Sequence, residues 1–365
     1  MAAARALGVA VRVAMLAALL PACATLAEGA GGDENLPNAA AGPFREVRSA
    51  ELGNQRPAPN GLENGDIFPR DVAVLDVDGD PATLAVLAWA AVNIAPDGEE
   101  ASFDAPANAI VRYGALDGRS FDRTPVPVLE AEGPGDFVAS PAVLRHGAEV
   151  LLWFDTPQGI ALAAAADTES FTRADVPVLA AADSGWDAGA TPRHPGVVRL
   201  DDGSLRMFYE VDLGTGTAIG EAASSDGRSW SRVGSAPALA PRAPAAEGAA
   251  QRWDDAAVGA PSPLLDGDET GRTVLRVYHS ATDHEGVQVV ALAARYGDDG
   301  PLQRAEGPVF GALGGMAPHE PCVVRFDGFT ILYATQRASS SDAEAHPAVA
   351  IGVAPATITL PTPVP

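Results

Sequence analysis

Two kinds of short segment recur along the chain in their pattern of apolar and polar residues. One is a hairpin-like unit with an apolar run, a turn containing Asp, an aromatic residue and a closing Pro, as in AIGEAASSDGRSWSRVGSAPALAP (Ala218–Pro241). Similar units span Tyr113–Ala131, Ala163–Ala181 and Arg295–Ala312. Apolar runs joined by Asp-Gly turns predict antiparallel strand pairs.

The other recurring unit starts at a polar residue, usually before Pro, and joins an apolar run to a second run rich in aromatics. Five copies occur, at Arg70–Ala90, Ala139–Asp155, Arg193–Glu210, Pro261–His279 and His319–Ala334. Their polar anchor residues are separated by 69, 54, 68 and 58 positions. Four strands per repeat and five repeats predict an all-β fold, a five-bladed β-propeller with four-stranded blades. A β-sandwich of equal strand number would not predict the repeat.

The predicted propeller domain spans residues 44–365, and its last blade needs further strands. Either the C-terminal run AVAIGVAPATITL or the early run Phe44–Leu52 can supply them. Closing the ring matters because an unpaired edge strand invites aggregation.

The N-terminus has the pattern of an export signal. Arg5 and Arg12 flank the start of the apolar run Val13–Leu20, which is too short to cross a bilayer as a helix. The run ends in Leu-Pro-Ala-Cys, which resembles the lipobox of bacterial lipoproteins. The resemblance implies a signal peptide over residues 1–22, lipidation of Cys23 and anchoring to the cell envelope, periplasmic or at the cell surface. A plain signal peptide cleaved nearby is the alternative, and it also predicts export.

Residues 23–43 are small, polar and unpatterned, which predicts a flexible linker. If Cys23 is lipidated, the second cysteine, Cys322, has no partner for an intramolecular disulfide. It lies in the apolar run EPCVVRF, which favours a buried, inert thiol.

Charge and composition restrict the classes of partner and cofactor that we expect. The net charge is −24 and the chain contains no Lys, so we expect no binding to nucleic acid, which requires a cationic surface. The six His residues show no metal-ligand spacing, and no phosphate-binding glycine loop follows a strand. We therefore expect no metal and no other cofactor, and a monomer.

Candidate chemistry lies where the inner strands of the propeller begin, because these strands converge at one mouth of the central channel. The polar residues just before the recurring Pro, one per blade, are Asp71, Ser140, His194, Ser262 and Glu320. A ring of polar residues at one mouth is a candidate site. The alternative is that such positions are polar because water fills the channel.

Several features resemble the five-bladed propeller glycoside hydrolases, the family-43-like group that includes arabinanases, xylosidases, invertases and related mannoside phosphorylases. These are the Trp-Asp loops at residues 186–187 and 253–254, the polar-Pro strand starts, and the runs LRMFYEVD and SSDGRSWSR. The resemblance implies a carboxylate base or nucleophile at Asp71 and a general acid at Glu320. It also implies further carboxylates in the third and fourth blades, where this chain has His194 and Ser262.

Other residues near the predicted mouth are candidates for substrate binding. Trp186 and Trp253 either stack on a sugar ring or pin the loops between blades. Cationic groups beside the two carboxylates suggest an anionic sugar, and Glu210 is a reserve carboxylate. The complete predicted binding set is Arg70, Ser140, Trp186, Arg193, His194, Glu210, Trp253, Ser262 and His319.

Two functions are consistent with this pattern. The first is an exported, lipid-anchored enzyme that cleaves glycosidic bonds of an extracellular glycan with two carboxylates. The second is a non-catalytic propeller that binds a glycan or a protein through a vestigial site. The serine and histidine at Ser262 and His194 favour the second. The sequence leaves open the sugar, the linkage, and whether hydrolysis or phosphorolysis would occur.

Overall fold

The computed structural model describes residues 44–50, 69–76, 85–94, 105–115, 121, 125–244, 252–267, 272–305, 307–311, 316–326, 329–338 and 348–355. The chain divides into two units, Met1–Ala39 and Ala40–Pro365, and every described residue belongs to the second. The predicted signal peptide, the lipidation site Cys23 and the predicted linker over 23–43 therefore lie outside the described residues. Within the described residues, no helix has the length and apolar character of a membrane span.

The strands form five separate antiparallel sheets. The first contains β2 (Arg70–Asp76), β3 (Val86–Val92), β4 (Ala109–Ala115) and β5 (Val126–Glu130). The second contains β6 (Ala139–His146), β7 (Glu149–Thr156), β8 (Gly159–Ala165), β9 (Thr172–Arg173) and β10 (Leu179–Ala180). The third contains β11 (Arg193–Arg199), β12 (Leu205–Asp212), β13 (Thr217–Ser224) and β14 (Ser231–Val233).

The fourth sheet contains β15 (Ala257–Gly267), β16 (Thr273–Thr282), β17 (Gln288–Tyr296) and β18 (Gln303–Arg304). The fifth contains β19 (Met316–Phe326), β20 (Phe329–Ala338), β21 (Ala348–Pro355) and β1 (Arg45–Ala50). In this last sheet β1 pairs with β21, so the N-terminal strand is the outermost one. Both segments that the sequence offered for completing the last sheet are thus used.

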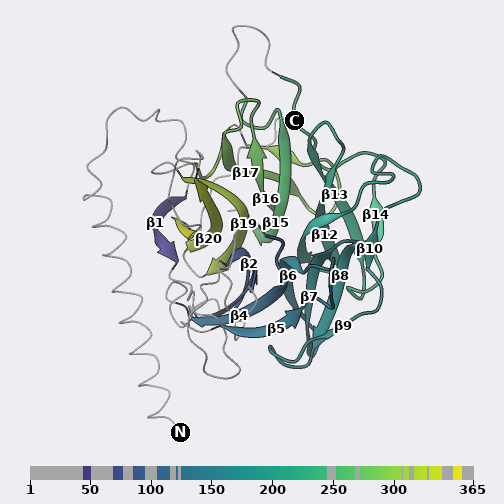
Figure 1. Ribbon diagram of the computed structural model, residues 1–365. Helices are drawn as coiled ribbons and strands as arrows, with labels where there is room; N and C mark the ends of the chain where they lie inside the picture. The colour runs from purple at the N-terminus through teal and green to yellow at the C-terminus, as the bar shows by residue number, and fades with distance from the viewer. Residues whose placement is uncertain are drawn as a thin grey trace. The chain divides into compact units, whose positions relative to one another are not determined.

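The first strands of the five sheets form a closed ring. The contacts run from β2 to β6, β11, β15 and β19, and from β19 back to β2. In Figure 1 the labels β2, β6, β15 and β19 gather at the centre of the domain, while β5, β9 and β14 lie toward its rim. The domain is therefore an all-β propeller, as the repeat predicted.

The core lies between neighbouring sheets, because both faces of each sheet are covered. Consecutive side chains of a strand point to opposite faces. In β12, for example, Tyr209 packs with Trp153 toward the second sheet, and Phe208 packs with Val277 toward the fourth. Burial on both faces explains why the strands are apolar runs rather than alternating apolar and polar residues.

The predicted Asp turns are present where they are described. Asp226 Oδ1 accepts hydrogen bonds from the backbone N–H groups of Arg228 and Ser229, both at 2.8 Å. These bonds to the ionised form lower the pKa of Asp226 to about 2. The next residue, Gly227, has φ +72° and its carbonyl oxygen accepts from the indole N–H of Trp153. The recurring Asp thus shapes a structural turn.

Candidate active site

Each inner strand contains one residue in the left-handed backbone region. The five non-glycine residues with positive φ among those described have values from 45° to 54°, and each lies at a register shift near the start of an inner strand; they are Asp71, Ser140, His194, Ala260 and Glu320. Non-glycine residues adopt this region at a cost, and such strain concentrates at functional sites. The structure thus gives one special position per sheet.

Four of these five residues are those predicted from the sequence, and the fourth position differs. The sequence predicted Ser262, but the residue with positive φ in β15 is Ala260. The segment Ala260–Pro263 contains two prolines, and the prediction chose the wrong one as the repeat anchor. Ser262 Oγ instead accepts the backbone N–H of Val323 at 3.0 Å, which links β15 to β19.

The backbone N–H of each strained residue is held by a side chain from the preceding sheet. Four acceptors lie at equivalent places near the end of the second strand: Thr335 for Asp71, Asp155 for His194, Glu210 for Ala260 and Ser280 for Glu320, at 2.8–3.1 Å. The equivalent residue in the first sheet is Ala91, which offers no side-chain acceptor. Ser140 therefore donates its N–H to Asp71 Oδ2, at 3.2 Å.

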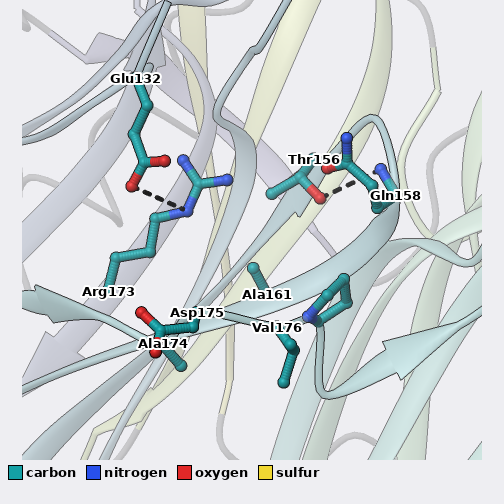
Figure 2. A pocket seen from close by; sticks show the side chains of 9 residues that line it. Glu132, Thr156, Gln158, Ala161, Arg173, Ala174, Asp175 and Val176 are labelled. Atoms are coloured by element: carbon teal, nitrogen blue, oxygen red, sulfur yellow. Dashed lines mark hydrogen bonds and ion pairs between the residues drawn. The ribbon is translucent and has the colours of Figure 1, made fainter.

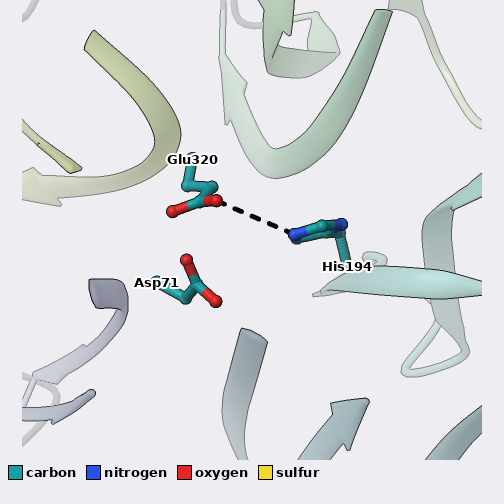
Figure 3. Close-up of side chains that lie close together, drawn as sticks. All are labelled: Asp71, His194 and Glu320. Atoms are coloured by element: carbon teal, nitrogen blue, oxygen red, sulfur yellow. Dashed lines mark ion pairs between the residues drawn. The ribbon is translucent and has the colours of Figure 1, made fainter. Parts of the chain in front are cut away.

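Asp71, His194 and Glu320 come together at this end of the ring. One donor atom from each lies within 4.8 Å of the others. Figure 3 shows the carboxyl groups of Asp71 and Glu320 pointing toward one another, with the His194 ring beside them. Glu320 Oε1 is 3.9 Å from His194 Nε2 and 3.1 Å from His319 Nδ1. The predicted pair of carboxylates therefore forms one compact cluster.

The two carboxyl groups have pKa values shifted in opposite directions. Burial, the charge of Glu320 and a hydrogen bond to it raise the pKa of Asp71 well above its usual value. Burial also acts to raise the pKa of Glu320, but His319 and the hydrogen bond from Asp71 hold it well below its usual value. Asp71 therefore holds the proton, which is the reverse of the roles that the sequence resemblance implies.

His194 supplies positive charge to the cluster. Burial lowers the pKa of His194, but the surrounding carboxyl groups outweigh burial and raise the pKa to about 9. Those groups are Glu210, Asp155, Asp71 and Glu320. Glu210 Oε2 lies 3.4 Å from His194 Nδ1, and Asp155 accepts the His194 backbone N–H. His194 is consequently an imidazolium at neutral pH.

One imidazole and two carboxylates form a donor set that divalent cations accept. A cation bound by Asp71, His194 and Glu320 would need a neutral imidazole and two ionised carboxylates. Without an ion the shifts favour protons on His194 and Asp71, so a cation would have to displace both protons. The cluster thus balances its charges with its own protons.

The remaining predicted binding residues have structural partners. The Arg70 guanidinium donates to the carbonyl oxygen of Ala105 at 2.6 Å, and the Arg193 guanidinium lies 5.4 Å from the centre of the Phe137 ring. Trp186 is partly buried against the core between the second and third sheets. Trp253 packs edge-on against His279. These contacts support the interpretation that both tryptophans fix the loops between the sheets. Stacking of either tryptophan on a sugar ring stays a prediction.

Of the acceptors on the second strands, sequence reasoning missed Asp155, Ser280 and Thr335, and it named Glu210 only as a reserve carboxylate. A signal was present, since each follows an aromatic residue by two positions, in WFD, FYE, YHS and YAT. Asp155 is 2% exposed, and burial raises its pKa to about 6 even though it accepts the His194 N–H. It contributes a fourth carboxyl near His194.

A separate hollow of about 220 Å³ lies in the second sheet (Figure 2). Its wall includes Thr156 and Gln158 from the turn after β7, and Arg173 from β9. Arg173 already pairs with Asp136 at 2.8 Å and approaches Glu132 at 3.9 Å. None of the ring residues lines this hollow, so it is distinct from the carboxyl cluster.

Comparison with known proteins shows the fold only. No family model and no curated protein matches the chain. A thermostable family-43 glycoside hydrolase matches with a TM-score of 0.57 and 14% identity over 87% of this chain and 97% of that one. An exo-1,5-α-L-arabinanase from a bovine ruminal metagenomic library gives 0.53 and 14% over 79% and 94%. A β-1,2-mannobiose phosphorylase from Listeria innocua gives 0.55 and 13% over 88% and 97%.

Proposed function

We propose that this protein is a carbohydrate-active enzyme that cleaves glycosidic bonds with Asp71 and Glu320. The observation that carries the proposal is the pair itself: two carboxyl groups within one cluster whose pKa values are shifted apart. Environments that separate the pKa values of two neighbouring carboxyls assign one as acid and the other as base or nucleophile. The fold likeness to glycoside hydrolases supports carbohydrate as the substrate class.

In the proposed reaction Asp71 donates its proton to the glycosidic oxygen as the bond to the anomeric carbon breaks. Inverting enzymes hold their carboxyl groups about 6.5–9.5 Å apart to admit a water, and retaining enzymes about 5–5.5 Å. One oxygen of Asp71 and one of Glu320 lie within 4.8 Å of each other, which is below the separation that admits a water between the two groups. We therefore propose that Glu320 attacks the anomeric carbon directly. Water then cleaves the glycosyl ester, giving its proton to Asp71 and restoring Glu320 as a carboxylate.

The test is turnover of a panel of aryl glycosides, plant glycans and bacterial glycans by wild type, Asp71→Asn and Glu320→Gln. We expect both variants to lose turnover by about 10²–10⁴-fold or more, because each removes one proton-transfer or bond-forming group. Glu149→Gln is a matched control, since Glu149 is a half-exposed surface carboxylate paired with Arg228. Nuclear magnetic resonance of the first product should show retained anomeric configuration. Full activity of either site variant would refute the assignment.

A second candidate is glycan binding without catalysis. It is favoured by the composition of the ring, in which only two of the five strained residues are carboxylic. The discriminating result is retention of the wild-type protein on a glycan array with no turnover of any glycan that it binds.

The architecture and cellular setting complete the proposal. We propose that the five described sheets are the five blades of the propeller, and that the domain acts as a monomer on an extracellular glycan. The N-terminal pattern supports export and attachment to the cell envelope through a lipid on Cys23. Cys23→Ala should release the protein from the membrane fraction, and unchanged partitioning would contradict the anchor.

A further inference from the structure

One oxygen of each catalytic carboxyl group is held by a neighbouring side chain. Asp71 Oδ2 accepts two hydrogen bonds from Ser140, one from the backbone N–H at 3.2 Å and one from Oγ–H at 3.0 Å. Glu320 Oε1 lies 3.1 Å from His319 Nδ1 and 3.9 Å from His194 Nε2. Each carboxyl group therefore has one oxygen whose position is fixed.

The other oxygen of each group is buried without a donor. Asp71 Oδ1 and Glu320 Oε2 are both inaccessible, and among the described residues no group outside the carboxyl pair donates a hydrogen bond to either oxygen. An unsatisfied buried oxygen is unfavourable by about 1–3 kcal/mol or more. A single proton between the two groups would satisfy both oxygens, and Figure 3 shows the two groups facing each other.

The residues that hold the fixed oxygens are themselves buried. His319 is 5% exposed and Ser140 is 5% exposed, so both side chains are packed against neighbouring groups. The Glu320 backbone is fixed by its N–H bond to Ser280 Oγ at 2.8 Å. Such support is what keeps reacting groups within the small tolerance that catalysis demands.

We propose that Ser140 and His319 are positioning residues that hold Asp71 Oδ2 and Glu320 Oε1, so that Asp71 Oδ1 and Glu320 Oε2 are the reacting atoms. This inference rests on the proposed function. Asp71 Oδ1–H gives its proton to the glycosidic oxygen, which takes the electron pair of the breaking bond. Glu320 Oε2 supplies the electron pair for the new bond to the anomeric carbon. Neither Ser140 nor His319 exchanges an atom with the substrate.

Two substitutions of His319 separate positioning from packing. The side-chain amide nitrogen of Asn replaces Nδ1 of His, whereas that of Gln replaces Nε2. His319→Asn should therefore keep the bond to Glu320 Oε1, and His319→Gln should lose it. On a glycoside turned over by wild type, we expect kcat to fall about 100-fold in His319→Gln, with KM little changed, and to recover to within about fivefold in His319→Asn.

Ser140→Ala tests the hydrogen bond from the Ser140 hydroxyl to Asp71 Oδ2, and Ser224→Ala is its matched control. Ser224 is also buried and donates a hydrogen bond of 3.0 Å from Oγ to an aspartate, Asp226, but it is the last residue of β13 and lies outside the carboxyl cluster. We expect kcat to fall about tenfold in Ser140→Ala, where the backbone N–H bond remains, and to stay unchanged in Ser224→Ala. Equal effects in the two variants, or equal effects of Asn and Gln at His319, would overturn the proposal.

Crystal structures of the variants test the positioning separately from the chemistry. In His319→Asn the Glu320 carboxyl group should keep its wild-type orientation, and in His319→Gln it should rotate away. If no glycan is turned over but the carboxyl group rotates as expected, the positioning stands and the proposed enzymatic function fails. If Glu320 keeps its orientation in both variants, the positioning role fails whether or not the protein is an enzyme.

Discussion

Two buried glutamates show how differently this propeller treats a carboxyl group. Glu221, in β13, meets the Arg295 guanidinium through both oxygens, at 2.6 and 2.8 Å, and Arg206 approaches to 3.4 Å. Glu320 meets two histidines and a second carboxyl group instead. The side chains are comparably enclosed, with Glu221 6% and Glu320 15% exposed. The difference is in the partner.

The partner decides whether a proton can be exchanged. Arginine stays charged at every accessible pH, so the pair of Arg295 with Glu221 holds the sheets together and passes on no proton. His194 and Asp71 can each gain or lose a proton, and both have raised pKa values, so the state of the cluster can respond to a ligand. The Glu221 pair is therefore suited to stabilising the fold, and the Glu320 cluster is suited to proton transfer.

The arginine-paired arrangement recurs elsewhere in the propeller. Asp187 contacts Arg232 at 2.7 Å, Asp254 contacts Arg304 at 3.2 Å and Asp266 contacts Arg276 at 3.2 Å. Asp187 and Asp254 are the aspartates of the two Trp-Asp loops, which explains why these loops recur. These three aspartates therefore have arginine as their partner, which does not lose its proton.

Breaking the Glu221 pair should give the largest loss of stability. Arg295→Met removes the bidentate partner and leaves Glu221 buried with only the longer contact to Arg206. Removing one partner of a buried ion pair typically lowers the free energy of unfolding by about 3–5 kcal/mol. Denaturant-induced unfolding, monitored by circular dichroism, measures the change.

Arg228→Met is the matched control for this experiment. Arg228 contacts Glu149 at 2.9 Å, but their side chains are 43% and 46% exposed. A surface pair contributes about 0–1 kcal/mol. Equal destabilisation by Arg228→Met and Arg295→Met would mean that burial does not separate the two classes of contact.

The fold could be predicted from the sequence because it repeats. The recurring strand pairs and Asp turns predicted the propeller, and a run near Phe44 was one of two segments predicted to complete the last sheet, which in fact uses both. The fourth anchor was misplaced because Ala260–Pro263 contains two prolines, and only the backbone geometry shows that Ala260 is the strained residue.

The site could be predicted only in part. The sequence indicated that Asp71, His194 and Glu320 would meet, because they occupy equivalent places in the repeat. It could not indicate which carboxyl group holds the proton. That depends on His319 beside Glu320 and on the burial of Asp71 next to the Glu320 charge. These are properties of three-dimensional neighbours rather than of spacing.

The cluster of Asp71, His194 and Glu320 should make the free energy of unfolding depend on pH, whereas the arginine–carboxylate pairs should not. His194 has a pKa of about 9 in the fold and about 6.5 when unfolded, so the folded state binds more protons between these values. Its contribution is fully present below about pH 6.5 and is lost as pH rises through 9. We expect a loss of about 2 kcal/mol between pH 6.5 and 8.5, measured by denaturant titration.

His194→Gln should flatten this slope. The raised pKa values of Asp71 and Asp155 add a slope of the same sign, but the part from Asp155 lies below about pH 6. A slope between pH 6.5 and 8.5 that persists unchanged in the variant would assign it to other groups and contradict the imidazolium at the centre.

Asp71→Asn should alter stability far less than Arg295→Met does. Asp71 already carries a proton, so the neutral amide replaces it at nearly the same shape and keeps an oxygen for the bonds from Ser140. We expect the free energy of unfolding at neutral pH to change by no more than about 1 kcal/mol. A loss comparable with that of Arg295→Met would show that Asp71 is ionised in the folded protein.

The smallest expected effect on stability comes from supplying the acceptor that the first sheet lacks for the Ser140 backbone N–H. Four of the five strained residues have their N–H held by a second-strand side chain, and Ala91 stands where the first sheet would provide one. Ala91→Ser offers Ser140 a new acceptor, which leaves Asp71 Oδ2 with the Ser140 hydroxyl alone. We expect stability to change by about 0.5–1 kcal/mol or less, because one hydrogen bond replaces another. Turnover should fall more than stability, since the bond that Asp71 loses is one that positions it, whereas unchanged turnover would mean that the Ser140 hydroxyl alone suffices to hold Asp71.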